Sequence, residues 1–560
     1  MKAIYKSLAA ALIATPLLTG CIEEAEPTTI ITADQLQSSP KAVEALVYAL
    51  SGHLNNVGTL STSYHFDWGY PSMLHIRDVM TEDMYVRDAG GYNWFSSWSS
   101  NDVSLGADYL ICQYSWNYYY EQILTCNNVM GNIDREEAKA NQQLAFYLAA
   151  GLTARAYVYL EVARLYEFLP TEFNTGVSAE GNSILGLTAP WVDENTTEDM
   201  AHNNPRLTHD EMFGKILTDL TDAIEYFNLG IKSADKTLAS PGVAYGLLAR
   251  LYLWDASYKA EVDLDADGAT EAYNKAAEYA RLAIITSGAT PLTQEEWLDK
   301  TRGFNDSSFS SWMYAGQYVQ EDAAVQTSLL NWTSFMCNEQ NFGYAGSAAG
   351  AYTEIGASLY NRMNDRDFRK LSYKAPDDSP LADRVPYIDA EHAATYFDSP
   401  YIAIKFRPGS GNMDEFLIAC SVAYPLMRVE EMYLIEAEAV AHVNPAQGRQ
   451  LLVDFMRTYR YSTYSTKVTS EEDVVEEIIF QKRVELWGEG QSFFDIKRLN
   501  YSVERWYNGT NFEPGLDTFN TNGRPAWMNF VINMQEVTNN SALVGFNSPS
   551  PAGLYDPIRQ

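Results

Sequence analysis

Cysteine is scarce in this chain, with five residues in 560. Beyond Cys21, the remaining four are Cys112, Cys126, Cys337 and Cys420, and their spacing matches neither a zinc site nor a redox pair. An exported protein could pair them as disulfides. The pattern favours the other alternative, in which all four are small buried hydrophobic side chains.

Basic residues are few. The chain has 39 Lys and Arg against 73 Asp and Glu, a net charge of −34. Nucleic-acid binding needs basic surface that neutralises phosphate, so this class of partner is excluded. The same charge argues against anionic lipid and strongly anionic substrates. A neutral ligand is favoured.

Catalytic motifs are missing. The chain holds no HExxH, GxSxG, P-loop or GxGxxG sequence, and its seven histidines are scattered. No pattern requires a cofactor, and we expect a protein that is not an enzyme. A glycoside hydrolase needs only two well-placed carboxylates, so a surface-anchored hydrolase is the alternative.

The apolar run at the N-terminus is too short to span a membrane. It covers Leu8–Leu18 and follows Lys2 and Lys6, whereas a transmembrane helix needs about 20 residues. Residues 1–20 therefore indicate a cleaved signal peptide. The sequence that follows Leu18, Thr-Gly-Cys21, resembles the bacterial lipoprotein box, which implies that Cys21 carries the lipid. The alternative is an ordinary signal peptide with a chance cysteine.

An acidic tether is expected over residues 21–33. Its Ile22–Pro27 segment resembles the surface-export signal of Bacteroidota lipoproteins. The alternative is a solvated linker that happens to be acidic. The resemblance implies a protein anchored by lipid to the outer membrane and facing the exterior.

Helical periodicity dominates the rest, which we expect to be a single domain over residues 34–560. Apolar and small residues recur at helical spacing over residues 34–54, 115–287 and 425–499. One long helix is expected from Asp134 to Phe168, where a capping box begins it and Pro170 follows its end. Antiparallel pairs with small-residue faces predict an all-α, tetratricopeptide-like superhelix.

Two irregular regions interrupt this pattern, residues 55–114 and 288–424, and a coil is expected over residues 500–560. Both irregular regions are rich in aromatic residues, and the whole chain has 38 Tyr and 12 Trp. Loops this long are uncommon in a compact domain unless they are functional. Tyr and Trp rings suit flat, weakly polar ligands such as sugars.

Several segments together resemble the SusD/RagB family of outer-membrane nutrient-binding lipoproteins. They are Gly151–Leu160 (GLTARAYVYL), Leu248–Leu253 (LARLYL), Pro425–Ala439 (PLMRVEEMYLIEAEA), Arg483–Gly490 (RVELWGEG) and Phe494–Arg498 (FDIKR). Gln481, Lys482 and Ser492 depart from the last pattern, which puts one or two polar contacts in doubt.

The resemblance implies a function in uptake without chemistry. The protein would bind a saccharide and deliver it to a SusC-like TonB-dependent transporter, or, like RagB, bind peptides. A helical scaffold without ligand is a further alternative. The expected ligand residues are Arg77, Asp78, Tyr85, Tyr92, Asn93, Trp94, Trp98, Trp312, Tyr314, Tyr318 and Trp332. For each ring, packing of the loops or contact with the transporter is the alternative.

A DxDxDG run, Asp263, Asp265, Asp267 and Gly268, resembles a calcium loop. Position twelve is Asn274 rather than the usual Glu, so a plain acidic turn is the alternative.

Acidic and basic residues also gather near the end of the last family motif, where Glu489 and Asp495 accompany Arg483 and Arg498. We expect a buried ionic network here rather than a catalytic carboxylate pair.

Overall fold

The computed structural model describes residues 40–87, 105–514, 518–556 and 558. Its longer helices are α2 (Pro40–His53), α3 (Tyr70–Val79), α4 (Leu110–Gly131), α6 (Gln142–Tyr166), α8 (His209–Leu229), α9 (Pro241–Tyr258), α10 (Ala266–Ser287), α17 (Val429–Val443), α18 (Pro445–Tyr459) and α19 (Glu471–Glu485). A π-helical segment, η2 (Lys259–Asp263), extends α9.

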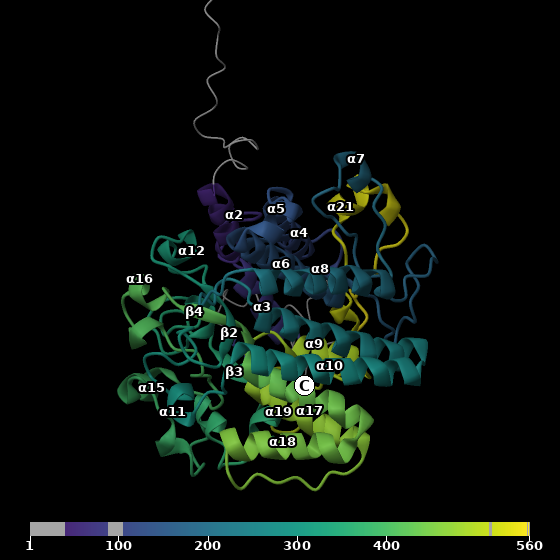
Figure 1. Cartoon of the computed structure of the whole chain (residues 1–560). Helices are drawn as coiled ribbons and strands as arrows, with labels where there is room; N and C mark the ends of the chain where they lie inside the picture. The colour runs from purple at the N-terminus through teal and green to yellow at the C-terminus, as the bar shows by residue number, and fades with distance from the viewer. Residues whose placement is uncertain (1–39, 88–104, 515–517, 557, 559–560) are drawn as a thin grey trace, which may run out of the picture.

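These helices stack in antiparallel layers. The chain passes from α4 and α6 to α8, then to α9 and α10, and α10 packs on α17, which contacts α18 and α19 (Figure 1). Apolar side chains from the longer helices α2 to α10 and from part of α17 and α19 form one large core, and a second, smaller cluster lies among α17, α18 and α19. The predicted all-α, tetratricopeptide-like superhelix is confirmed.

Side-chain caps explain why the helices begin where they do. Thr208 and Glu211 form a reciprocal capping box at the start of α8, so two backbone N–H groups that lack a helical partner are satisfied. Ser240 caps α9 and Asn444 caps α18, and each is followed by a proline in the first turn. These local signals are readable in the sequence.

The long helix expected from Asp134 to Phe168 is wrong, because two helices occupy this stretch. They are α5 (Arg135–Ala140) and α6. Asn141 lies between them with φ −125° and ψ 107°, and its side chain accepts hydrogen bonds from the backbone N–H groups of Gln143 and Leu144. An asparagine that caps the next helix stops the preceding one.

Helix α3 lies inside the first region that we expected to be irregular. Every one of its residues is buried. A helix with no solvent face has no amphipathic period, so its sequence carries little of the usual helical signal. Gly69 precedes it with φ +80°, and a Cβ there would lie 2.5 Å from the carbonyl oxygen of Leu54.

The second irregular region packs beside the helical stack. The strand β3 (Thr353–Ile355) of this region pairs antiparallel with β1 (Met84–Val86) of the first irregular region. Its strand β2 (Trp312–Gln317) pairs antiparallel with β4 (Ala423–Arg428), which leads into α17. Its short helices are α11 (Gln294–Trp297), α12 (Ala323–Gln326), α13 (Trp332–Met336), α14 (Ala357–Arg362), η3 (Phe368–Ser372), η4 (Ala382–Arg384), α15 (Ala390–Tyr396), η5 (Gly409–Gly411) and α16 (Phe416–Ala419).

The C-terminal segment lies against the helical body. It follows α20 (Ser492–Arg498), and its short helices are η6 (Ala526–Met528), α21 (Met534–Asn539) and η7 (Ser541–Leu543); a further short helix, α7 (Glu198–Ala201), lies beside it at the top of Figure 1. Phe530 N–H donates to the carbonyl of Leu165, and Trp527 Nε1 donates to that of Met80.

The four described cysteines are all buried and free, as expected of small hydrophobic side chains. Within the described ranges, the helices are too short or too polar to cross a membrane.

Candidate functional site

Arg77, Asp78 and Tyr85 do not form an exposed ligand surface. Arg77 is fully buried and its guanidinium lies 2.7 Å from the Glu161 carboxylate. Asp78 is also buried and accepts a hydrogen bond from Gly490 N–H at 2.9 Å, and burial raises its pKa well above the usual value. Tyr85 is 4% exposed in strand β1. The prediction is corrected: these side chains join α3 and β1 to the core.

The expected rings of the middle region are buried too. Trp332 lies 5.0 Å from Phe406 between ring centroids, and Tyr314 lies 5.8 Å from Tyr157. Trp312, Tyr314, Tyr318 and Trp332 are each at most 5% exposed. Rings enclosed in this way offer no free face to a sugar, so their assignment as ligand residues is also wrong. The remaining predicted residues, Tyr92, Asn93, Trp94 and Trp98, lie outside the described residues.

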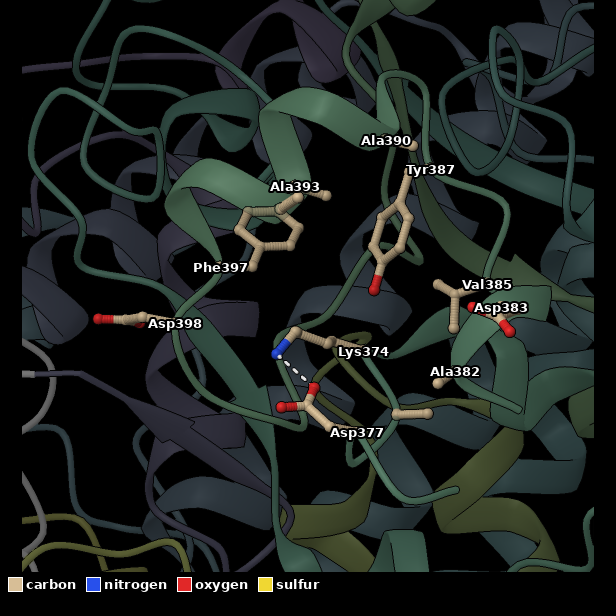
Figure 2. A pocket seen from close by; sticks show the side chains of 12 residues that line it. Lys374, Asp377, Ala382, Asp383, Val385, Tyr387, Ala390, Ala393, Phe397 and Asp398 are labelled. Atoms are coloured by element: carbon tan, nitrogen blue, oxygen red, sulfur yellow. Dashed lines mark ion pairs between the residues drawn. The ribbon is translucent and has the colours of Figure 1, made fainter. Parts of the chain in front are cut away.

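A hollow of about 700 Å³ opens in the second irregular region, among η4, α15 and the segment that follows η3. Figure 2 shows the rings of Tyr387 and Phe397 on one side of it, with Lys374 and Asp377 opposite. The rest of the lining is Ala375, Ala382, Asp383, Val385, Ala390, Ala393, Ala394 and Asp398. Its volume lies within the range of small-molecule pockets, about 300–1,000 Å³.

Buried polar groups hold the wall that carries Tyr387. Glu339 is 1% exposed; its carboxylate accepts a hydrogen bond from Ile388 N–H at 2.7 Å and pairs with Arg407. Arg407 in turn donates to the carbonyl of Pro386 at 2.9 Å. The backbone on both sides of Tyr387 is therefore fixed by side chains from other parts of the region.

The opposite wall is fixed by backbone pairing. Lys374 N–H donates to the carbonyl of Ile402, and the Lys374 carbonyl accepts from Tyr401 N–H, both at 2.8 Å. Asp389 precedes α15 and caps it by accepting from the N–H groups of Glu391 and His392. The hollow thus has a rigid frame, which reduces the ordering cost of binding.

Rings and charges inside the hollow leave some groups free for a ligand. Phe397 is buried against Tyr352, with 5.4 Å between ring centroids, whereas Tyr387 is half-buried. Burial and the nearby Asp377 charge raise the pKa of Tyr387 to about 12, so its hydroxyl keeps its proton at neutral pH. Lys374 Nζ lies 3.6 Å from Asp377 Oδ1, in a partly exposed pair.

Arg87 joins the end of β1 to the rim of this hollow. Its guanidinium donates to the carboxylate of Asp398 and to the hydroxyl of Ser399, both at 2.5 Å. The hydrogen bond from Arg87 lowers the pKa of Asp398. Arg87 is the last described residue before residues 88–104.

The hollow lies in the second irregular region, where ligand residues were expected, but the residues that line the hollow are not among those that the sequence predicted. Lys374, Asp377, Tyr387 and Phe397 follow no periodic pattern. The usable signal is a Pro-rich, aromatic stretch over residues 374–398.

The DxDxDG run does not adopt the backbone conformation of a calcium loop. Helix α10 already begins at Ala266, and Asp265 caps it by accepting from Gly268 N–H at 3.0 Å. A calcium loop of this type arranges ligands from positions 1 to 12 around a sharp turn at the glycine in position 6, whereas here position four, Ala266, already begins α10. Calcium binding by Asp263, Asp265 and Asp267 stays a prediction that this geometry does not favour.

Among the described residues, one group of potential metal ligands lies close together: His209, Asp210 and Asp255. His209 Nδ1 lies 2.6 Å from Glu167 and Nε2 lies 3.3 Å from Asp255. Burial alone lowers the pKa of His209, but the two carboxylates raise it to about 9. Both nitrogens then carry protons at neutral pH, so the imidazole has no lone pair for a metal.

Glu489 and Asp495 lie in buried ion pairs, as predicted, whereas Arg483 of the expected network pairs with Glu82 and Asp83 instead. Glu489 pairs with Lys405 and Arg428, and Asp495 pairs with Lys482 and Arg498. The glycines on either side of Glu489 have positive φ, and a Cβ at Gly488 would lie 2.4 Å from Phe406.

Two parts of this chain match models of known protein families. Residues 70–253 match a family model described as starch-binding and associating with the outer membrane, and residues 419–552 match the SusD family model. No match was found among curated protein sequences.

Solved structures share the fold. A SusD-like carbohydrate-binding protein from Bacteroides vulgatus superposes with a TM-score of 0.65 at 21% identity, over 90% of this chain and 96% of its own. A SusD superfamily protein from Bacteroides thetaiotaomicron gives 0.62 at 18%, over 90% and 99%. A laminarin-binding SusD-like protein gives 0.57 at 15%, over 89% and 97%. With both family models matched in the helical body and at the C-terminal motifs, the chain belongs to the SusD/RagB family.

Proposed function

We propose that this protein binds a neutral polysaccharide or oligosaccharide at the cell surface and delivers it, without chemistry, to a SusC-like TonB-dependent transporter. The observation that carries the proposal is the hollow beside Tyr387 in a chain of this family. Relatives of the same fold are described as carbohydrate-binding and laminarin-binding.

The chemistry of the hollow suits a sugar. The half-buried Tyr387 ring presents an apolar face on which the C–H groups of a pyranose stack. Its protonated hydroxyl donates, the Lys374 ammonium donates, and the Asp377 carboxylate accepts, so sugar hydroxyls find partners of both kinds. Weak stacking of this kind permits release, which a protein that hands on its ligand requires.

The electrostatics favour binding over hydrolysis. A glycosidase needs one carboxylic acid that stays protonated, with a raised pKa. Arg87 does the opposite to Asp398 and keeps it ionised. Asp377 has a lysine beside it.

A lipid on Cys21 would keep the protein at the membrane. Each buried methylene contributes about 0.8 kcal/mol, so several acyl chains anchor a protein durably. The acidic tether then confines the binding site near the partner and raises its effective concentration there.

Affinity electrophoresis on a panel of neutral polysaccharides, including laminarin and amylopectin, tests the proposal. We expect retention on at least one glycan, and the Tyr387→Ala variant should lose about tenfold in affinity for it, the scale of a lost stacking contact of about 1–2 kcal/mol. Tyr48→Ala is the matched control, since Tyr48 is an exposed tyrosine on α2, and Figure 1 shows α2 well apart from α15, which borders the hollow.

Two outcomes would contradict the proposal. One is retention on none of the neutral glycans. The other is release of reducing sugar from the retained glycan, which would favour the hydrolase alternative.

A further inference from the structure

The hollow beside Tyr387 is bordered by carboxylates. Asp377, Asp383 and Asp398 line it, and Figure 2 shows them on different sides of the opening. Asp377 is 96% exposed as a side chain and Asp398 is 71% exposed. A ligand chain that crosses the hollow therefore passes close to at least one of these groups.

Two cations beside the hollow, Lys374 and Arg87, are already paired with carboxylates. The Lys374 ammonium is beside Asp377, and the Arg87 guanidinium is bonded to Asp398. Asp383 forms no ion pair within the described part of the chain. The next residue, Arg384, is not among the residues that line the hollow, so the Asp383 carboxylate brings a negative charge to the lining without an ion-pair partner there.

The segment that surrounds the hollow carries further negative charge. Residues 374–398 contain six carboxylates, and their only cationic side chains are Lys374 and Arg384. Like charges placed against each other across a binding site cost affinity, and such repulsion is a usual source of specificity. Surface charges act over about 8 Å at physiological salt, so the carboxylates lining the hollow have more effect than distant ones.

We propose that the carboxylates around this hollow, with Asp383 as the one without an ion-pair partner in the lining, make the site select neutral glycans and reject polyanionic ones such as sulfated or uronate-rich polysaccharides. This selectivity rests on the proposed glycan-binding function of the same site. The fold of the family does not determine the charge of the ligand, whereas the carboxylates around this hollow do.

The test compares one backbone in two charge states. The probe is the neutral polysaccharide that the protein retains, set against its sulfated derivative, with alginate and chondroitin sulfate as further anionic probes. At 50 mM salt we expect the sulfated derivative to bind at least tenfold more weakly than the neutral glycan. At 1 M salt, where the Debye length is about 3 Å, this ratio should shrink severalfold.

Asp383→Asn tests the residue. It removes one charge from an exposed position, and we expect the affinity ratio of sulfated to neutral glycan to rise about threefold. Glu472→Gln is the matched control, because it removes the same charge from the exposed start of α19, away from the hollow. The ratio should not change in that variant.

The outcomes separate the two proposals. Equal or tighter binding of the sulfated derivative, alginate or chondroitin sulfate would overturn the selectivity while leaving glycan binding intact. Equal shifts in Asp383→Asn and Glu472→Gln would also overturn it, because they would attribute the effect to the net charge of the molecule. Binding of neither neutral nor anionic glycan would contradict the proposed function itself.

Discussion

His209 shows how a single buried side chain can make the stability of this protein depend on pH. Its ring stacks on Tyr258 at 3.8 Å between centroids, and both of its nitrogens face carboxylates. Trp254 Nε1 donates to the same Glu167, at 2.7 Å. The imidazolium therefore joins the end of α6 to α8 and α9.

We expect this ion pair to stabilise the protein at neutral pH and to be lost in mild alkali. The pKa of His209 is about 9 in the folded protein, against about 6.5 when unfolded. The contribution is present in full below pH 6.5 and disappears as the pH rises through 9, with a size of up to about 3 kcal/mol. Urea unfolding at pH 6.5 and pH 9.5 measures it.

In His209→Gln the free energy of unfolding should be lower at pH 6.5 and should change less up to pH 9.5. His53→Gln is the control, since burial lowers the pKa of His53 to about 4 and it stays neutral over this range. If the wild-type and His209→Gln profiles run parallel, His209 is not the group responsible.

At the scale of elements, α19 is held by charge as well as by apolar packing. Glu485, near its end, is fully buried and lies within hydrogen-bond distance of Arg369, Arg428 and Arg460. Burial opposes the charged form, yet these guanidiniums lower the pKa of Glu485 well below its usual range. The three arginines come from η3, the end of β4 and the end of α18.

Glu485→Gln should destabilise the protein by about 3–5 kcal/mol, because the arginines then keep a buried charge without its partner. Glu476→Gln on the same helix removes an exposed ion pair to Arg362, and should cost less than about 1 kcal/mol. Urea denaturation of both variants checks this. Equal transition midpoints would mean that Glu485 is not essential to the junction.

At the scale of the whole molecule, we propose that a lipid on Cys21, near the N-terminus, holds the protein at the membrane. Cys21→Ala should move the protein from the membrane fraction to the soluble fraction, because the acyl chains that hold it would be absent. Fractionation of cells that express the full chain measures this. A Cys21→Ala variant that stays in the membrane fraction would contradict lipid anchoring.

Surface exposure is a separate prediction of the acidic tether. Replacement of Glu23, Glu24 and Glu26 by Gln should leave the protein in the membrane fraction but protect it from protease added to intact cells. If the variant remains as accessible as the wild type, the tether is only a linker.

The helical body could be predicted from the amino-acid sequence, because helix caps, prolines in first turns and helical spacing are local properties. Thr208, Ser240 and Asn444 each cap a helix through a side chain of the type that favours this position. The family motifs were readable for a related reason. Gly488 and Gly490 occupy positions with positive φ, where few other residues fit.

Which aromatic and charged side chains are enclosed in the core and which border the hollow became evident from the packing of the folded chain. Trp332 and Tyr387 both lie in the aromatic middle region, yet the first is enclosed by Phe406 and the second borders a hollow. The difference depends on groups far along the chain, such as Glu339 and Arg407, which position the wall beside Tyr387. Exposure of a side chain is a property of packing among distant segments, so it cannot be inferred from residue type and spacing.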